Sequence, residues 1–360
     1  MDENIIRVLI VDDSKAVGKF LTDVLSSDPA IKVVGHALDP FEARDMIKTM
    51  RPDVLTLDVE MPRMDGITFL KNLMRLRPMP VVMLSSLTAA GAEVTLNALS
   101  IGAVDFLVKR HPGGGDELNE YAQEIVTVVK NAVKAKLGAV SNQRLATFTH
   151  PDFNGWIQKV KINGRVNSNI SRVVAIGAST GGPEAIRQVL ENLKAADCAV
   201  VLSQHMPKRF MGPFAARLDS ISSFSFAEAG HNEKLLPGHG YVAPGDQHLQ
   251  FRRKNDDIIS CLSDAPKCNG HRPAVDVMFR SLCDTVGASS IGVLLTGMGN
   301  DGANGMKAMH DIGCLNIVQD ERSSAVWGMP GRAVGLGAVD AELGLCDIGP
   351  ALEKILGAQS

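Results

Sequence analysis

Aromatic residues are scarce in this 360-residue chain, making up only 4% of it. No apolar run approaches the ~20 residues that a membrane-spanning helix needs, and the amino terminus lacks the basic and apolar segments of a secretory signal. The formal net charge is only −3, so the chain has no excess of one sign to attract nucleic acid or an anionic membrane. We therefore expect a cytoplasmic protein with no nucleic-acid partner.

Paired cysteines are also missing. No C-x-x-C pair and no suitably spaced histidine accompanies the six cysteines, which all lie in the second half of the chain: Cys198, Cys261, Cys268, Cys283, Cys314 and Cys346. We expect them to be reduced, and we expect no cofactor in that half. Glycine is plentiful, with 34 residues, as in α/β chains with many tight turns. The length suggests two domains.

The first half alternates apolar strand patterns with helical ones. The expected strands cover residues 5–11, 32–35, 54–57, 80–84 and 103–108. This alternation predicts a doubly wound parallel sheet, in which functional residues gather at the carboxyl ends of the strands. The polar residues at those ends are Asp12, Asp13, Asp58, Ser85, Ser86 and Lys109. Each acid alone could be an ordinary turn or helix-capping residue. Together with the lysine they predict a divalent cation and a phosphoryl group in one crevice.

The same residues carry a resemblance. The pair Asp12-Asp13, the run from Asp58 to Gly66, Ser85 and Lys109 resemble the receiver domain of two-component response regulators. The resemblance implies a five-stranded flavodoxin-like domain over residues 1–115, phosphorylated by a histidine kinase. It implies Asp58 as the phosphoacceptor, Mg²⁺ held by Asp12, Asp13 and Asp58, phosphoryl contacts from Ser85 and Lys109, and Phe106 as the aromatic switch residue.

One difference from that family lies after the fifth strand. Receivers usually have proline directly after the lysine, whereas this chain reads Lys109-Arg110-His111-Pro112. The loop is therefore expected to differ in its switching detail rather than in its chemistry.

A connecting segment is expected over residues 116–171. Apolar residues at helical spacing between Leu118 and Ala132 predict an amphipathic helix at its start. Residues 141–169 are rich in Asn, Ser, Gly and Lys and predict a tether, with a docking segment as the alternative.

The second half, residues 172–360, is expected to be another doubly wound, mainly parallel α/β domain. The strand 173–177 enters the turn that carries Ser179, the strand 199–205 ends at His205, and the strand 290–295 enters a glycine turn that carries Asp301. Further strands are expected at residues 241–246, 258–262 and 315–318.

The turn at Ser179 fits the pattern G-x-S-x-G, which exposes a nucleophilic serine. Such a serine needs a histidine to take its proton and a carboxylate to orient that histidine, which His205 and Asp301 could supply. Asp276 and Ser203 are rival candidates. From position alone, His205 could equally be a hydrogen-bonded crevice histidine and Asp301 a helix N-cap. The glycine turn could also bind phosphate at a helix N-terminus.

A second resemblance narrows these alternatives. The runs 177–182, 204–206, 242–246, 271–276 and 295–302 resemble the catalytic domain of the chemotaxis protein-glutamate methylesterase/glutamine deamidase family. The resemblance implies Ser179 as nucleophile, His205 as base and then acid, and Asp301 as its orienting carboxylate. Thr180 and Met298 are the expected oxyanion stabilisers. The implied activity is phosphorylation-regulated removal of methyl esters, as methanol, from glutamates of chemotaxis receptors, with deamidation of receptor glutamines.

The protein would therefore approach the membrane only through its receptors. The alternative function is a non-enzymatic response regulator whose second domain binds a nucleotide or a protein partner. Against it, the sequence shows no phosphate-binding lysine motif and no ribose-binding acid in a βαβ context.

Overall fold

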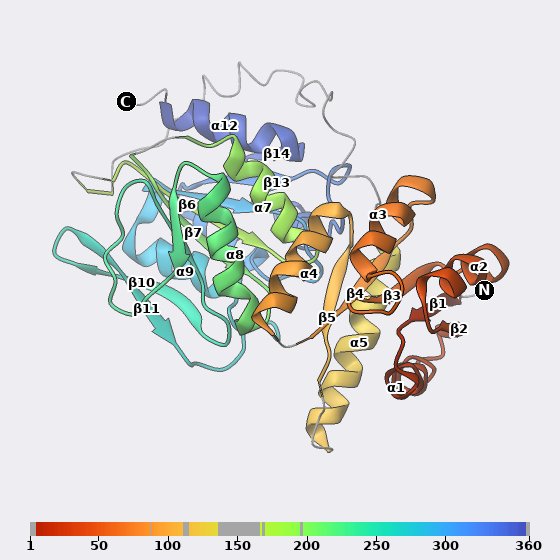
Figure 1. Cartoon of the computed structure of the whole chain (residues 1–360). Helices are drawn as coiled ribbons and strands as arrows, with labels where there is room; N and C mark the ends of the chain where they lie inside the picture. Colours follow the sequence, from red (N-terminus) through yellow and green to blue (C-terminus); the bar gives the residue numbers. More distant parts are fainter. Residues whose placement is uncertain are drawn as a thin grey trace. The chain divides into compact units, whose positions relative to one another are not determined.

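The computed structural model describes residues 5–86, 88–110, 115–135, 166–167, 170–194 and 197–357. The chain divides into two compact units, Met1–Gly138 and Ala139–Ser360 (Figure 1). In the described residues no helix is long and apolar enough to cross a membrane. The expected tether at 141–169 lies outside the described residues except for 166 and 167.

The first unit is a five-stranded parallel sheet with helices between the strands. The elements in order are β1 (Ile6–Val11), α1 (Lys15–Leu25), β2 (Ile31–Ala37), α2 (Pro40–Met50), β3 (Val54–Asp58), α3 (Gly66–Leu76), β4 (Val81–Ser85), α4 (Ala89–Ile101), β5 (Asp105–Val108) and α5 (Asp116–Lys134). The strand order is β2-β1-β3-β4-β5. All five expected strands and the doubly wound fold are confirmed.

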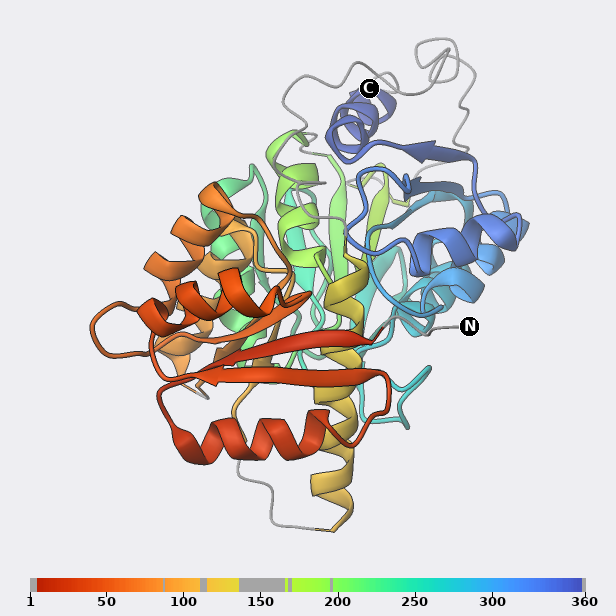
Figure 2. The same ribbon diagram turned by 90° about the vertical axis from the view of Figure 1, so that its right-hand side faces the viewer.

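The local sequence explains these helices. Side-chain oxygens of Ser14, Asp39, Asp65 and Thr88 accept hydrogen bonds from the first turns of α1, α2, α3 and α4, satisfying N–H groups that have no partner within the helix. Helix α5 packs against α1 and against strands β3, β4 and β5. Figure 2 shows the sheet of this unit with α1 on one side and α5 running alongside. The strand order reverses between β1 and β3, so a crevice is expected beyond their carboxyl ends.

The second unit has a seven-stranded sheet, also parallel throughout. Its elements are β6 (Val173–Ala178), α7 (Gly182–Glu191), β7 (Ala199–Gln204), α8 (Lys208–Ile221), β8 (Ser225–Glu228), β9 (His239–Val242), β10 (His248–Lys254), β11 (Asp257–Ser263), α9 (Val275–Thr285), η1 (Gly287–Ser289), β12 (Ser290–Leu294), α10 (Ala303–Asp311), β13 (Leu315–Gln319), α11 (Met329–Gly335), β14 (Ala341–Leu343) and α12 (Leu345–Gly357). The order is β14-β13-β12-β6-β7-β9-β8.

Helices cover both faces of this sheet. Helix α7 contacts α8 and α12, and α10 contacts α9 and α11, which forms two helical layers. The strand expected at 258–262 lies outside the seven-stranded sheet, because β10 and β11 pair antiparallel as a separate hairpin that packs on α9. Central strands β6, β7 and β12 are buried along their whole length, as near-continuous apolar runs in parallel sheets are.

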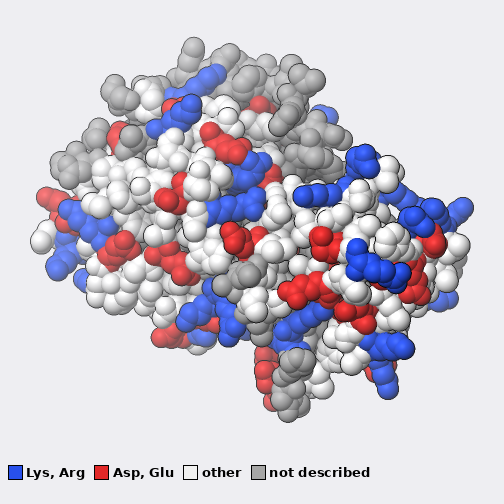
Figure 3. Space-filling view, viewed as in Figure 1, with Lys and Arg blue, Asp and Glu red and all other residues white. Residues whose placement is uncertain are grey.

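On the face shown in Figure 3, charged side chains of both signs are interspersed among the described residues. This distribution agrees with the small net charge of the sequence, and the view shows no broad patch of one sign.

Candidate functional site

The first unit gathers its predicted polar residues at the carboxyl ends of β1, β3, β4 and β5. Asp12, Asp13 and Asp58 each offer one oxygen, and these oxygens all lie within 4.8 Å of one another. Lys109 Nζ lies 2.8 Å from Asp12 Oδ2 and 2.9 Å from Asp58 Oδ2. Three carboxylates at this spacing are the oxygen ligands that a hard divalent cation prefers, so the donor set fits Mg²⁺.

Burial controls the electrostatics of this crevice. Asp58 is only 5% exposed, and burial raises the pKa of its carboxyl, with Lys109 offsetting only part of that effect. Burial alone would lower the pKa of Lys109, but the two carboxylates beside it raise the pKa above its ordinary value. Lys109 is therefore a fixed positive charge beside the predicted phosphoacceptor.

The hydroxyl of Ser85 does not face open solvent. Ser85 is fully buried, and its Oγ accepts a 2.7 Å hydrogen bond from Thr95 Oγ1 on α4. Thr95 Oγ1 also lies 2.7 Å from the carbonyl of Gly91. The sequence offered no pattern that singles out Thr95, because a threonine inside a helix is ordinarily a packing residue.

The segment after β5 holds Arg110 against α5. Arg110 stacks over the Tyr121 ring at 5.4 Å and pairs with Glu124 at 3.2 Å. Tyr121 in turn donates a hydrogen bond to the Val108 carbonyl. His111 and Pro112 lie outside the described residues. Phe106, the predicted switch residue, is 9% exposed on β5.

In the second unit the predicted triad residues follow three adjacent strands. Ser179 follows β6, His205 follows β7, and Asp301 lies in the loop after β12. Because the sheet order is β12-β6-β7, the three residues lie at one carboxyl edge, where the strand order reverses. The structure therefore brings together the residues that the sequence selected.

His205 and Asp301 are in direct contact. His205 Nε2 lies 2.7 Å from Asp301 Oδ2, and both side chains are nearly inaccessible, at 7% and 1% exposure. Within the described residues the other ring nitrogen, Nδ1, is buried without a hydrogen-bond partner. Nδ1 is thus the nitrogen left to receive a proton.

Asp301 also caps a helix. Its Oδ2 accepts from the Val275 N–H at 2.7 Å, and its Oδ1 from the Asp276 N–H at 3.1 Å, in the first turn of α9. The sequence raised an N-cap role for Asp301, and the helix it caps is α9 rather than α10, which follows it. Burial raises the pKa of Asp301, but hydrogen bonds from His205, Asn269 and Val275 outweigh it and lower the pKa to about 2. The group is a permanent anion beside His205.

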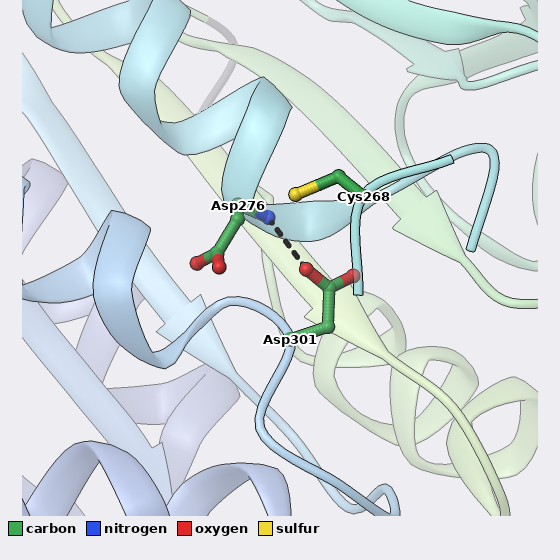
Figure 4. A group of neighbouring side chains, drawn as sticks. All are labelled: Cys268, Asp276 and Asp301. Atoms are coloured by element: carbon green, nitrogen blue, oxygen red, sulfur yellow. Dashed lines mark hydrogen bonds between the residues drawn. The ribbon is translucent and has the colours of Figure 1, made fainter. Parts of the chain in front are cut away.

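The rival acid Asp276 lies next to Asp301. Its Oδ1 accepts from the Gly305 N–H at 2.6 Å, in the first turn of α10, and its Oδ2 from Asn269. Figure 4 shows Asp276, Asp301 and Cys268 together, with the Asp276 N–H directed at Asp301. Burial raises the pKa of the Cys268 thiol, and both carboxylates already accept N–H groups, so this donor set does not fit a metal ion.

A histidine that the sequence left unassigned lies on His205. The rings of His205 and His271 stack with centroids 3.6 Å apart and an interplanar angle of 7°. Burial, and then the proximity of His205, lower the pKa of His271 to about 4. At neutral pH the His271 ring is therefore uncharged and stacks flat against the face of the His205 ring. In the sequence, the one indication of a role for His271 was its position in the run 271–276, which resembles the methylesterase family.

The turn at Ser179 is held by buried polar groups. Its N–H donates to the Thr296 carbonyl at 3.0 Å, and its carbonyl accepts from Gly182 N and from Gln204 Nε2. The Gln204 amide also reaches the His205 carbonyl at 3.1 Å, so it ties the two backbones together. No hydrogen bond joins the Ser179 hydroxyl to His205 in the described part of the chain.

Glycine 297 leaves room for this turn. A Cβ there would lie 2.8 Å from the Ser179 Cβ and 2.3 Å from Met329 Sδ. The predicted oxyanion residues lie on either side: Thr180 is the neighbour of Ser179, and Met298 follows Gly297. Thr296 Oγ1 donates to the Thr180 carbonyl at 3.0 Å, which joins the two segments. The rival Ser203 is fully buried within β7, one residue before Gln204.

Comparisons with known proteins agree with this arrangement. Residues 174–352 match the family model of the CheB methylesterase, and residues 8–121 match that of the response regulator receiver domain. A protein-glutamate methylesterase/protein-glutamine glutaminase of Hydrogenovibrio crunogenus is 46% identical, with 98% of each chain covered. Its counterpart from Xanthomonas campestris is 50% identical over 93% of each chain. The crystal structure of the Thermotoga maritima CheB methylesterase catalytic domain, 36% identical, superposes with a TM-score of 0.50, covering 52% of this chain and 98% of that one.

Fold and site thus define a response regulator whose output domain is a hydrolase. The chain belongs to the CheB methylesterase family, with a receiver domain preceding the methylesterase domain. The alternative of a non-enzymatic output domain is not favoured by these matches.

Proposed function

We propose that this protein hydrolyses methyl esters of glutamate side chains on chemotaxis receptors, and deamidates receptor glutamines, with Ser179, His205 and Asp301 as its catalytic groups. The observation that carries this assignment is the His205–Asp301 hydrogen bond. It leaves Nδ1 of His205 without a hydrogen-bond partner among the described residues, at the end of the strand next to that of Ser179.

The chemistry follows from these positions. His205 Nδ1 takes the Ser179 proton as Oγ attacks the ester carbonyl carbon, and backbone N–H groups of Thr180 and Met298 stabilise the oxyanion. His205 then gives the proton to the departing methoxide, which leaves as methanol. Water, activated by the same nitrogen, hydrolyses the acyl-enzyme to free glutamate and Ser179. With a glutamine substrate the leaving group is ammonia. Asp301 stabilises the imidazolium throughout.

The receiver domain supplies regulation. Asp58 accepts the phosphoryl group from a histidine kinase, with Lys109 and Ser85 contacting its oxygens. Asp12, Asp13 and Asp58 would hold Mg²⁺, which offsets the charge of the transferred phosphoryl group. For the Ser85 hydroxyl to donate to that group, its hydrogen must turn away from the carbonyl of Gly91 on α4, 3.3 Å from Oγ, so phosphorylation would change this contact with α4. We place the protein in the cytoplasm, meeting the membrane only through its receptors.

The test measures methanol release from methylated receptor, with and without a small-molecule phosphodonor. We expect Ser179→Ala to lower the rate on the order of 10⁶-fold, as removal of the nucleophile does in subtilisin. We expect Asp58→Asn to keep the basal rate and lose stimulation by the phosphodonor.

Ser203→Ala is the matched control, since it removes a serine from the neighbouring strand, and it should keep its activity. A serine-reactive phosphonate should label Ser179 in the wild-type protein. Methanol release by Ser179→Ala at the wild-type rate, or labelling at another residue, would show that the assignment is wrong.

A further inference from the structure

We propose that Asn269 is a positioning residue for the His205–Asp301 pair: its side-chain amide bonds two adjacent buried carboxylates at once and keeps Asp301 oriented toward His205. This inference rests on the proposed function, because it assigns Asn269 a part in keeping the proposed base active.

The backbone explains why an asparagine can occupy this position. Cys268 and His271 exchange two backbone hydrogen bonds, of 3.0 and 2.9 Å, around a two-residue turn. Both central residues are left-handed, with φ of 53° at Asn269 and 83° at Gly270. Asn-Gly is the pair that such turns favour, so the turn alone would account for the residue type. It does not account for what the side chain contacts.

The side chain points at the two acids. Asn269 Nδ2 lies 2.8 Å from Asp276 Oδ2 and 3.0 Å from Asp301 Oδ1. An amide nitrogen carries two hydrogens, so one group can donate to both carboxylates. The same short turn also places His271 on the face of His205. The turn therefore supports the base and its acid together.

The contact of the Asn269 amide with both acids matters because the two carboxylates are buried close together. Asp276 and Asp301 are 3% and 1% exposed, and oxygens of the two lie within 4.8 Å of each other. Two buried carboxylates this close tend to share a proton, unless N–H donors stabilise both charges. Besides Asn269, the Asp301 carboxylate accepts hydrogen bonds from two α9 N–H groups and from His205. Among the described residues, the Asp276 carboxylate accepts hydrogen bonds only from Gly305 N and Asn269.

Removing Asn269 would therefore let the pair take up a proton at a higher pH. Burial raises the pKa of Asp276, whereas that of Asp301 is lowered to about 2, so this proton goes to Asp276. A protonated Asp276 can donate to Asp301 in place of the amide, which weakens the hold of Asp301 on the imidazolium of His205, so activity would fall. The titratable and charged groups around the pair are His205 after β7, His271, Cys268 and Lys267 in and beside the turn, and Arg280 on α9.

The experiment compares the pH dependence of methanol release in the full-length protein. Asn269→Gly keeps the left-handed turn and deletes the amide. We expect kcat to fall about 10- to 100-fold, as loss of one hydrogen bond to a charged group predicts, with KM unchanged. The acid limb of the pH–activity profile should move to higher pH. Asn269→Asp also keeps the turn but replaces the donor with a third carboxylate, and should be less active still at pH 8.

The matched control is Asn255→Gly, the same change at an exposed left-handed residue (φ 55°) in the β10–β11 turn, which should behave as wild type. Ser179→Ala is measured in parallel. If Ser179→Ala is inactive while Asn269→Gly matches Asn255→Gly, this inference alone is overturned. If Ser179→Ala is as active as wild type, the proposed function fails instead. A lower kcat with an unmoved acid limb would mean that Asn269 is only structural, which also overturns the proposal.

Discussion

The stacked histidine His271 makes the stability of the methylesterase domain depend on pH, and the effect can be isolated with one substitution. In the folded chain the pKa of His271 is lowered from 6.5 to about 4, because burial and the adjacent His205 disfavour a second positive charge. In the unfolded chain the same ring titrates near its ordinary value. Between these values the unfolded state binds a proton that the folded state does not.

The sign follows from this difference. A group that binds more protons in the unfolded state makes stability rise with pH, so acidification from pH 6.5 toward pH 4 should destabilise the domain. The slope for one proton is about 1.4 kcal/mol per pH unit, which over this window accumulates to about 3 kcal/mol. Above pH 6.5 the effect should vanish, because His271 is then neutral in both states.

The assay follows the fluorescence of Trp327, whose indole N–H donates to the Gln319 carbonyl in the second unit, in a Trp156→Phe background that leaves it the single tryptophan of the chain. Urea unfolding of wild type and His271→Phe is compared from pH 4.5 to 8. Phenylalanine keeps a flat ring against His205 but cannot titrate. Groups that do not interact with His271 shift both proteins equally, so the difference between the proteins measures His271 together with its coupling to His205 and Asp301.

We expect that difference to change by up to about 3 kcal/mol, or roughly 1–1.5 M in the urea midpoint, between the two ends of the range. Equal pH dependence in the two proteins would refute the assignment of a neutral, buried His271.

Two further substitutions test the geometry of the site. Asp301→Asn should lower kcat by about 10⁴-fold, as loss of the triad carboxylate does in trypsin. The substitution should also lower the free energy of unfolding by about 1–3 kcal/mol, because one acceptor of the α9 N–H groups becomes a donor. Methanol release near the wild-type rate would contradict the proposed role of Asp301. Gly297→Ala should inactivate the enzyme with little loss of receiver phosphorylation, because the new Cβ would lie 2.8 Å from the Ser179 Cβ; unchanged phosphonate labelling of Ser179 in this variant would refute that close contact.

The periodicity of apolar residues and the residues typical of turns predicted most of the fold. Strands β1 and β6 are mainly apolar runs followed by the polar residues Asp12 and Ser179. In parallel sheets the carboxyl ends of the strands lie at one edge, so the sequence alone could group these polar residues. The hairpin β10–β11 was different. The apolar pattern of residues 258–262 predicted a further strand of the parallel sheet, whereas the structure pairs this strand antiparallel with β10. An apolar pattern predicts a strand but not the sheet that the strand joins.

The residues that support the site were beyond the reach of sequence patterns. Asn269 reads as a turn residue and His271 as one of nine histidines, and neither has a spacing that ties it to Asp301 or His205. Their contacts come from a turn packed across the end of the sheet by tertiary structure. Thr95 is similar, since its hydrogen bond to Ser85 joins residues on two elements that only the fold brings together.

The choice of ring nitrogen on His205 follows from strand order. His205 follows β7, Ser179 follows the adjacent β6, and Asp301 belongs to the loop after β12, one strand further away. Nδ1 lies next to the Cβ and Nε2 lies at the far side of the ring. Adjacent strands are ~4.8 Å apart, so a partner on the next strand suits Nδ1 and a partner two strands away suits Nε2. The 2.7 Å contact of Nε2 with Asp301 fits this order, as does Nδ1, which has no hydrogen-bond partner in the part of the chain that the structure describes. A sheet with the acid on the neighbouring strand and the serine beyond it would favour the opposite use of the ring, so the strand order of the domain supports Nδ1 as the nitrogen that serves Ser179 in the proposed mechanism.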